Sequence, residues 1–176
     1  ALRLDNRPAT ALDGGSVRVP ASGSAPLALT RLAVHSRVAV LGGAVSASVL
    51  LATASTLTVQ QPLSAASLSA TGCTVSASAA VSAGVMALAA SGWTATSSLT
   101  ASASLHLASS TYTSGSGQVV AAGWLAVDGA STLRTSSTSA DTLVVQADVV
   151  SIDGTLQAGA VQLTSRNFSA SASASL

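Results

Sequence analysis

The chain has 176 residues, enough for one domain with a real core. Only 7% of its residues are charged, and its net charge of +1 provides no basic surface for nucleic acid or an anionic membrane. A single cysteine excludes an intrachain disulfide, and recurring Val, Leu and Thr distinguish the sequence from charge-poor disordered chains. Ser, Thr, Val and Gly interrupt every candidate helix, so the composition favours strands.

The N-terminal part contains no signal-peptide pattern, and the chain begins Ala-Leu-Arg-Leu. We therefore expect a fragment of a longer chain or one subunit of a fibre. The uncharged run from Val38 to Ala54 is short for a membrane helix of ~20 residues and contains Gly42 and Gly43. No membrane span is expected.

A six-residue repeat covers residues 45–110 and continues to 116. Large apolar residues occupy nine of the twelve first positions, third positions are almost all small, and even positions are mostly Ser, Thr, Ala or Gly. Alternation within each hexad is typical of a strand. Three short strands would close a triangular coil of ~18 residues whose first, third and fifth positions face inward. The prediction is all-β: a single-domain parallel β-helix over 1–176, with about 18–20 residues per coil and about nine coils.

Apolar residues also recur from coil to coil in three expected ladders. The first is Leu27, Val45, Leu63, Val81, Leu99, Val119, Thr138 and Leu156. The second is Leu32, Leu50, Leu68, Val85, Leu105, Leu125, Leu143 and Val161. The third is Val38, Leu57, Val75, Trp93, Tyr112, Leu133, Ile152 and Phe168. We expect the phase to slip near Gly42-Gly43, residues 114–117 and Asp128-Gly129.

The hexads resemble the hexapeptide-repeat β-helix families, with an aliphatic first position and a small residue four later. They differ at the second position, where those families favour Gly or an acidic residue. The stretch from Leu143 to Thr164 looks more like the right-handed β-helix of filamentous-haemagglutinin-type adhesins. Both resemblances imply a parallel β-solenoid, and they imply opposite handedness.

Residues suited to catalysis are few. His35 and His106 should lie about four coils apart, and an exposed His106 matches the histidine base of hexapeptide acyltransferases in type only. Two distant histidines cannot supply the zinc site of the hexapeptide-type carbonic anhydrases. Asp148 and Asp153 flank one strand and could approach at a corner, to hydrolyse a glycosidic bond or bind calcium.

Turn chemistry explains the aspartates better, because Asp128 and Asp153 each precede a glycine. We predict no catalytic, cofactor or metal site and no enzyme activity. Cys73 is expected to be a buried structural thiol. Asn167-Phe-Ser169 is an N-glycosylation sequon, which makes Asn167 a candidate glycosylation site.

The distribution of charge along the sequence favours a structural function. Residues 38–127 contain no Asp or Arg, whereas residues 1–37 carry net +3 and residues 128–176 carry net −2. We predict a rigid structural or adhesive rod in an extracellular filament, sheath or adhesin stalk. Its partners would be copies of itself, head to tail or lateral, or a longer copy of its own chain, with surface carbohydrate as a further ligand.

An ice-binding or carbohydrate-binding solenoid is the alternative, followed by a polysaccharide-acting enzyme. Thr94-Ala-Thr96 and Thr111-Tyr-Thr113 carry the Thr-x-Thr pattern of flat, water-ordering solenoid faces. Tyr112 within the second triplet counts against that alternative.

Overall fold

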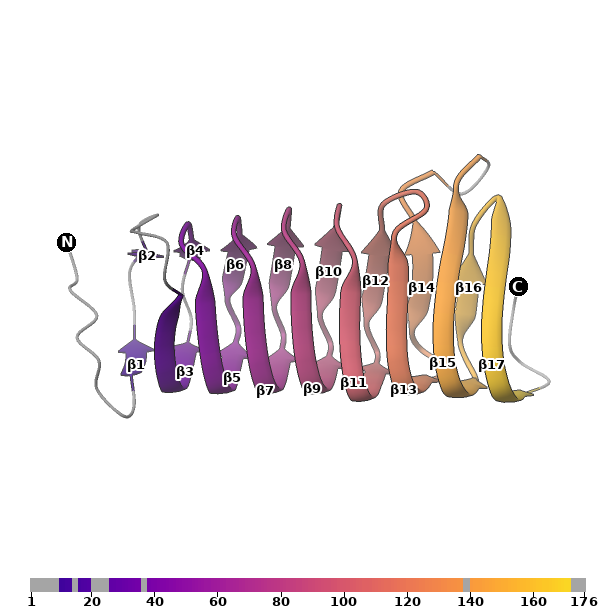
Figure 1. The fold of residues 1–176 in the computed structure, drawn as a ribbon, viewed down its shortest axis with the longest axis horizontal. Helices are drawn as coiled ribbons and strands as arrows, with labels where there is room; N and C mark the ends of the chain where they lie inside the picture. Colours follow the sequence, from indigo (N-terminus) through magenta and orange to yellow (C-terminus); the bar gives the residue numbers. More distant parts are fainter. Residues whose placement is uncertain (1–9, 14–15, 20–25, 36–37, 138–139, 172–176) are drawn as a thin grey trace.

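The computed structural model describes residues 10–13, 16–19, 26–35, 38–137 and 140–171, and it is an all-β parallel solenoid of about eight coils. The predicted fold class is therefore confirmed. Figure 1 shows the coils stacked in chain order, from indigo β1 to yellow β17. Every strand pairs in parallel with the equivalent strand of the neighbouring coil.

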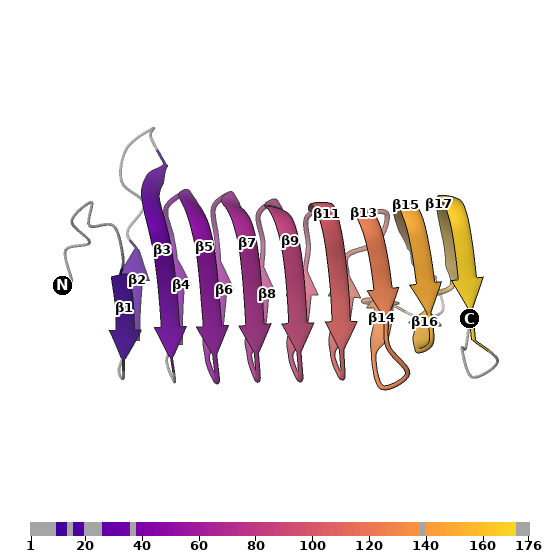
Figure 2. The ribbon, with the colours of Figure 1, turned by 90° about the horizontal axis from the view of Figure 1, so that it is seen from below.

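Two sheets build the coils. The odd-numbered sheet has nine strands, which lie side by side in Figure 2. They are β1 (Thr10–Asp13), β3 (Leu27–His35), β5 (Val45–Thr53), β7 (Leu63–Thr71), β9 (Val81–Ala89), β11 (Leu99–Ala108), β13 (Val119–Val127), β15 (Thr142–Ile152) and β17 (Ala160–Ala170). The even-numbered sheet has eight short strands. They are β2 (Ser16–Val19), β4 (Val38–Leu41), β6 (Thr56–Val59), β8 (Thr74–Ala77), β10 (Gly92–Ala95), β12 (Thr111–Ser114), β14 (Thr132–Thr135) and β16 (Thr155–Gln157).

Each long strand bends in its middle. In β5, Val45 and Ala47 are buried, Ser48 and Val49 both face outward, and Leu50 is buried again. The pairing of β5 with β7 skips Ser48, which marks the corner. One long strand thus lines two sides of the coil, and the short strand lines the third.

The bend corrects the expected inward positions. Strict alternation places Leu51 inside, but Leu51 is half-buried and Leu50 is fully buried. The extra outward residue at the bend shifts the phase by one, so each coil has seven inward positions. In one coil they are Val45, Ala47, Leu50, Ala52, Ser55, Leu57 and Val59, and in the next they are Leu63, Ala65, Leu68, Ala70, Cys73, Val75 and Ala77.

The first predicted ladder is right from Leu27 to Leu99, and parts of the other two are right beyond it, where Trp93, Tyr112 and Leu133 are register partners, as are Leu105 and Leu125. The register partners from Leu27 to Leu99 recur at one constant interval in the sequence, so no slip occurs at Gly42-Gly43. Leu99 then pairs with Val120 rather than Val119, after a register shift between Ala101 and Ser104. From there the interval grows up to β15, because turns at 115–118 and 128–131 and the extra residues between Thr135 and Asp141 lengthen the coils, and it returns to the earlier value between β15 and β17.

One-residue errors placed several ladder members on the wrong face. Val85 and Val38 are exposed, and their neighbours Met86 and Ala39 are buried instead. Phe168 was expected inside but is 47% exposed, because it lies on β17, the last strand of its sheet.

The other errors fall in the last coils. Ile152 belongs to β15 in the odd-numbered sheet, so Leu133 pairs with Leu156 instead. Leu143 and Val161 pair with each other but not with Leu125, whose partner is Val150. Thr138 lies outside the described residues.

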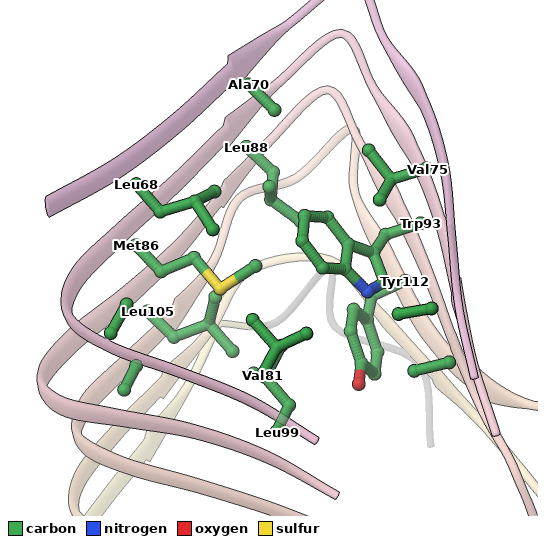
Figure 3. Close-up of a cluster of buried hydrophobic side chains, with 14 of the residues drawn as sticks. Leu68, Ala70, Val75, Val81, Met86, Leu88, Trp93, Leu99, Leu105 and Tyr112 are labelled. Carbon is green, nitrogen blue, oxygen red and sulfur yellow. The ribbon is translucent and has the colours of Figure 1, made fainter. Parts of the chain in front are cut away.

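The interior is aliphatic apart from one aromatic column. Trp93 and Tyr112 are neighbours on β10 and β12, both fully buried, and Figure 3 shows them packed among Leu88, Met86 and Leu105. Trp93 Nε1 and the Tyr112 hydroxyl are buried without a hydrogen-bond partner in the described part of the chain. Burial raises the pKa of Tyr112 well above its ordinary value, so this phenol stays neutral in the folded protein.

Candidate binding surfaces

A buried column of hydroxyls runs along the corner between the long and short strands. Ser91 Oγ accepts a hydrogen bond from the Cys73 amide at 3.1 Å and lies 2.8 Å from the Ala89 carbonyl, to which it donates. Ser110 Oγ accepts from the Ser91 amide in the same way, and Ser131 Oγ from the Ser110 amide. The column satisfies backbone groups that the tight corner leaves outside the ladders.

Each of four corners begins with a residue at positive φ. Ala54, Gly72, Ala90 and Ser109 have φ between 48° and 63° and precede the inward Ser or Cys. Only Gly72 is the residue type for which this conformation carries no steric cost. The corner is therefore structural, with strain at three of its four steps.

Cys73 is buried, as the sequence predicts, and it occupies the Ser position of this column. Its Sγ lies 3.3 Å from the Thr71 carbonyl, to which it donates. It packs as part of the core and faces no groove.

The structure does not bring the two histidines together. His35 lies on β3 and His106 on β11, four coils further along, and His106 is exposed. Both placements agree with the sequence prediction.

The acidic residues occupy separate corners. The Asp128 carboxylate accepts hydrogen bonds from the amides of Ser109 and Ala130 and from the Ser131 hydroxyl. Partial burial raises the pKa of Asp128, but these hydrogen bonds outweigh it and lower the pKa overall. This aspartate is a turn residue, as expected.

Asp141 is a second turn aspartate. The Ser136 hydroxyl and the Ser137 amide donate to its carboxylate and lower its pKa.

Asp148 and Asp153 do not converge. Asp148 lies at the bend of β15, where Arg166 Nε on β17 approaches its Oδ1 to 3.4 Å. Asp153 lies beyond the end of β15, at the next corner, where its amide donates to Val127. The paired carboxylates that a glycosidase or calcium site needs are absent from this coil of the described structure.

Two outward-facing rows on the even-numbered sheet carry mostly Thr hydroxyls, and nine of their twelve residues are Thr or Ser. The first row, in register, is Thr56, Thr74, Gly92, Thr111, Thr132 and Thr155. The second is Thr58, Ser76, Thr94, Thr113, Arg134 and Gln157. Tyr112 points inward between the rows and does not interrupt them. Sequence reasoning missed most of these rows because each member comes from a different coil, far from the next in the sequence.

A shallow groove of about 640 Å³ lies outside the odd-numbered sheet, across β11, β13, β15 and β17. The part of the groove over β13 is lined by small residues, including Ala121 and Gly123. The part over β15 and β17 is lined by longer side chains, including Gln146 and Arg166. Trp124 follows Gly123 in the chain and is 50% exposed. The repeat predicts no definite position for this tryptophan.

The C-terminal coil presents an open edge. β17 pairs with β15 on one side, and no described strand pairs with its other side. Val161 and Phe168 are exposed on it. Asn167 of the sequon is also exposed there, beside Phe168, and its glycosylation stays a prediction.

Within the described ranges, no three His, Cys, Asp or Glu side chains gather as metal ligands, and no helix is long and apolar enough to cross a membrane. Searches of protein-family models, of characterised proteins and of solved structures found no match to the chain.

Proposed function

We propose that this solenoid is a structural rod that associates end to end, in an extracellular filament, sheath or adhesin stalk. The open edge of β17 carries the proposal. An unpaired strand edge offers a row of backbone donors and acceptors to another strand, and natural proteins usually protect such edges. Here the edge is eleven residues long and bears the apolar side chains Val161 and Phe168.

Charge supports a head-to-tail arrangement. The described coils stack in chain order, and in the sequence residues 1–37 carry net +3 and residues 128–176 carry net −2. Opposite charges at the two ends favour contact between the first coil of one copy and the last coil of another. The same edge would equally accept a further coil in a longer copy of the chain.

The lateral surface supports a rod rather than an enzyme. Residues 38–127 contain no Asp or Arg, and their outward positions are mainly Ser, Thr, Ala and Gly. The resemblance of residues 143–164 to filamentous-haemagglutinin-type adhesins agrees with this function. The hexapeptide-repeat resemblance agrees with the coil but adds no partner.

End-to-end association is tested by sedimentation and electron microscopy of the chain at low and high salt. We expect filaments one solenoid wide, with an axial repeat of about 4.8 Å, that shorten as salt screens the terminal charges. Phe168→Asp places a charge on the open edge and should give monomers. Ser64→Asp is the matched control, because Ser64 is exposed on the side of β7, and it should leave filaments intact.

Two outcomes would refute the rod. Monomers of the unmodified chain at both salt concentrations would remove end-to-end association. Equal loss of filaments with both variants would show that the sides of the solenoid, not its ends, associate.

The hydroxyl rows favour ice binding as a second candidate function. Six of the eight positions on β6, β8, β10 and β12 are Thr, in rows whose members repeat at the ~4.8 Å strand spacing. A flat array of regularly spaced hydroxyls and methyls can hold ordered water. Gly92 and Ser76 interrupt it, and Arg134 Nε donates to Thr113 Oγ1 at 3.1 Å.

Thermal hysteresis tests this candidate. Thr94→Tyr would disrupt the centre of the array and abolish hysteresis, whereas Ser82→Tyr on the odd-numbered sheet would not. Absence of hysteresis in the unmodified chain would remove ice binding without affecting the rod.

A further inference from the structure

The groove outside the odd-numbered sheet has a definite cause in the sequence. Ala121 and Ala122 lie in register with Gln146 and Ala147 of β15, and Gly123 follows them at the bend, where the pairing skips one residue. A Cβ on Gly123 would lie 2.6 Å from the Ala103 carbonyl oxygen, so only glycine permits this close approach. Short side chains on β13 therefore form a hollow beside the longer ones on β15 and β17.

The side of the hollow formed by β15 and β17 carries polar side chains that can make further hydrogen bonds. Asp148 and Arg166 form an ion pair at 3.4 Å, and their side chains are 65% and 85% exposed. An exposed pair contributes little to stability. A guanidinium has five N–H donors and a carboxylate four acceptor sites, so one contact leaves most of them available. Gln146 and Thr164 add an amide and a hydroxyl to the lining.

An exposed tryptophan follows Gly123, the last residue of β13 that lines the groove. The chain has only two Trp, one Tyr and one Phe, and Trp93 and Tyr112 are buried. Trp124 is 50% exposed, and its register partner Val149 is 38% exposed. Leaving an indole in water forgoes up to about 1.5–3 kcal/mol of burial free energy, which a purely structural surface gives no reason to do. A flat indole face suits a ligand with one apolar side.

We infer that this groove binds a neutral oligosaccharide. A pyranose ring combines an apolar C–H face, which stacks on Trp124, with equatorial hydroxyls that hydrogen-bond to Asp148, Arg166 and Gln146. The single positive and single negative charge cancel, which disfavours nucleic acid and other polyanions. The groove is shallow and open, unlike the enclosed apolar sites of small ligands. It crosses four strands, or ~14 Å at the strand spacing, so it suits an extended chain of sugars.

Binding is tested on an array of neutral oligosaccharides of the glucan, mannan, galactan and chitin types, followed by calorimetric titration with the best hexasaccharide. We expect Trp124→Ala to weaken binding at least tenfold, and Arg166→Gln or Asp148→Asn to weaken it severalfold. Val85→Ala is the matched control, because Val85 lies in the same outward row, two coils from Trp124, and is 44% exposed. It should bind as the unmodified chain does.

Each contrary outcome overturns the inference. No binding to any neutral glycan would remove the ligand class, and binding unchanged in Trp124→Ala would remove the site. Binding that appears only in Asn167→Gln, which deletes the sequon, would mean that a glycan carried by the chain itself occupies the groove. Filament formation by the Trp124→Ala variant is measured separately, so failure here does not bear on the rod.

Discussion

Tyr112→Phe should stabilise the protein, because it removes an unpaired hydroxyl from the aromatic column of the core. The hydroxyl is fully buried and has no hydrogen-bond partner in the described residues. Burying such a group unpaired costs about 1–3 kcal/mol relative to water. The oxygen leaves only ~10 Å³ of extra space, and at about 24 cal/mol per Å³ this costs ~0.2 kcal/mol. We expect a net gain of about 1 kcal/mol, or a rise in Tm of about 2–4 °C for a chain of this size.

Urea denaturation, followed by circular dichroism, measures the change in the free energy of unfolding. Tyr112→Leu is the control, because it removes the ring that packs beside Trp93 and should cost about 2 kcal/mol. Tyr112 is the single tyrosine, so phenolate absorbance provides a second readout: it should appear only when the folded protein opens at high pH, since burial raises the pKa. A loss of stability with Phe, or reversible ionisation near pH 10 in the folded state, would refute the reasoning.

Three further substitutions test the corner. Ser91→Ala deprives the buried Cys73 amide of its acceptor and should cost about 1–3 kcal/mol, whereas Ser82→Ala on the exposed face should change unfolding in urea by less than about 0.5 kcal/mol. Ala90→Gly relieves a φ of 48° and should stabilise by up to about 1 kcal/mol in the same assay; a loss would show that this corner is not strained. Asp128→Asn should cost about 1 kcal/mol at pH 7, allowing for solvent screening of a partly exposed group. Because the folded pKa of Asp128 is lowered, its contribution is complete above the unfolded pKa near 4 and is lost as pH falls through the folded value, so the two proteins should converge in stability in strong acid. A gap in stability that persists in strong acid would contradict the assignment.

The repeat predicted the solenoid because coil geometry imposes its own period. Residues such as Leu63, Val81 and Leu99 must each fill the same interior position, so the sequence carries a constant register that can be recognised without the structure. The phase within a coil was not predictable to the same degree. The bend at Ser48 and Val49 adds one outward residue, and the residue types at these two positions do not predict a bend. That single residue explains why Leu50, not Leu51, is inside.

The surfaces were harder to predict than the core. The hydroxyl rows and the groove join residues from four or more coils, and the coils beyond Leu99 lose the constant interval of the earlier ones. Only the longer interval between β13 and β15 brings Gly123 next to Asp148, whereas Asp148 and Arg166 keep the regular interval. The buried Ser column was also missed, since Ser91 and Ser110 resemble the many exposed serines around them.

Because the middle coils share one constant register, this molecule can change its length by whole coils. Between β5 and β9, every residue of one coil has an equivalent directly above it, and each coil touches only its two neighbours. Duplicating residues 63–80 would insert one complete coil, with every interior side chain meeting an interior side chain. Inserting a single residue into one arm of a strand would turn the rest of that arm inside out, whereas the bend can absorb one residue, as β11 shows between Ala101 and Ser104. Such a gene can therefore lengthen or shorten its product by recombination in steps of one turn.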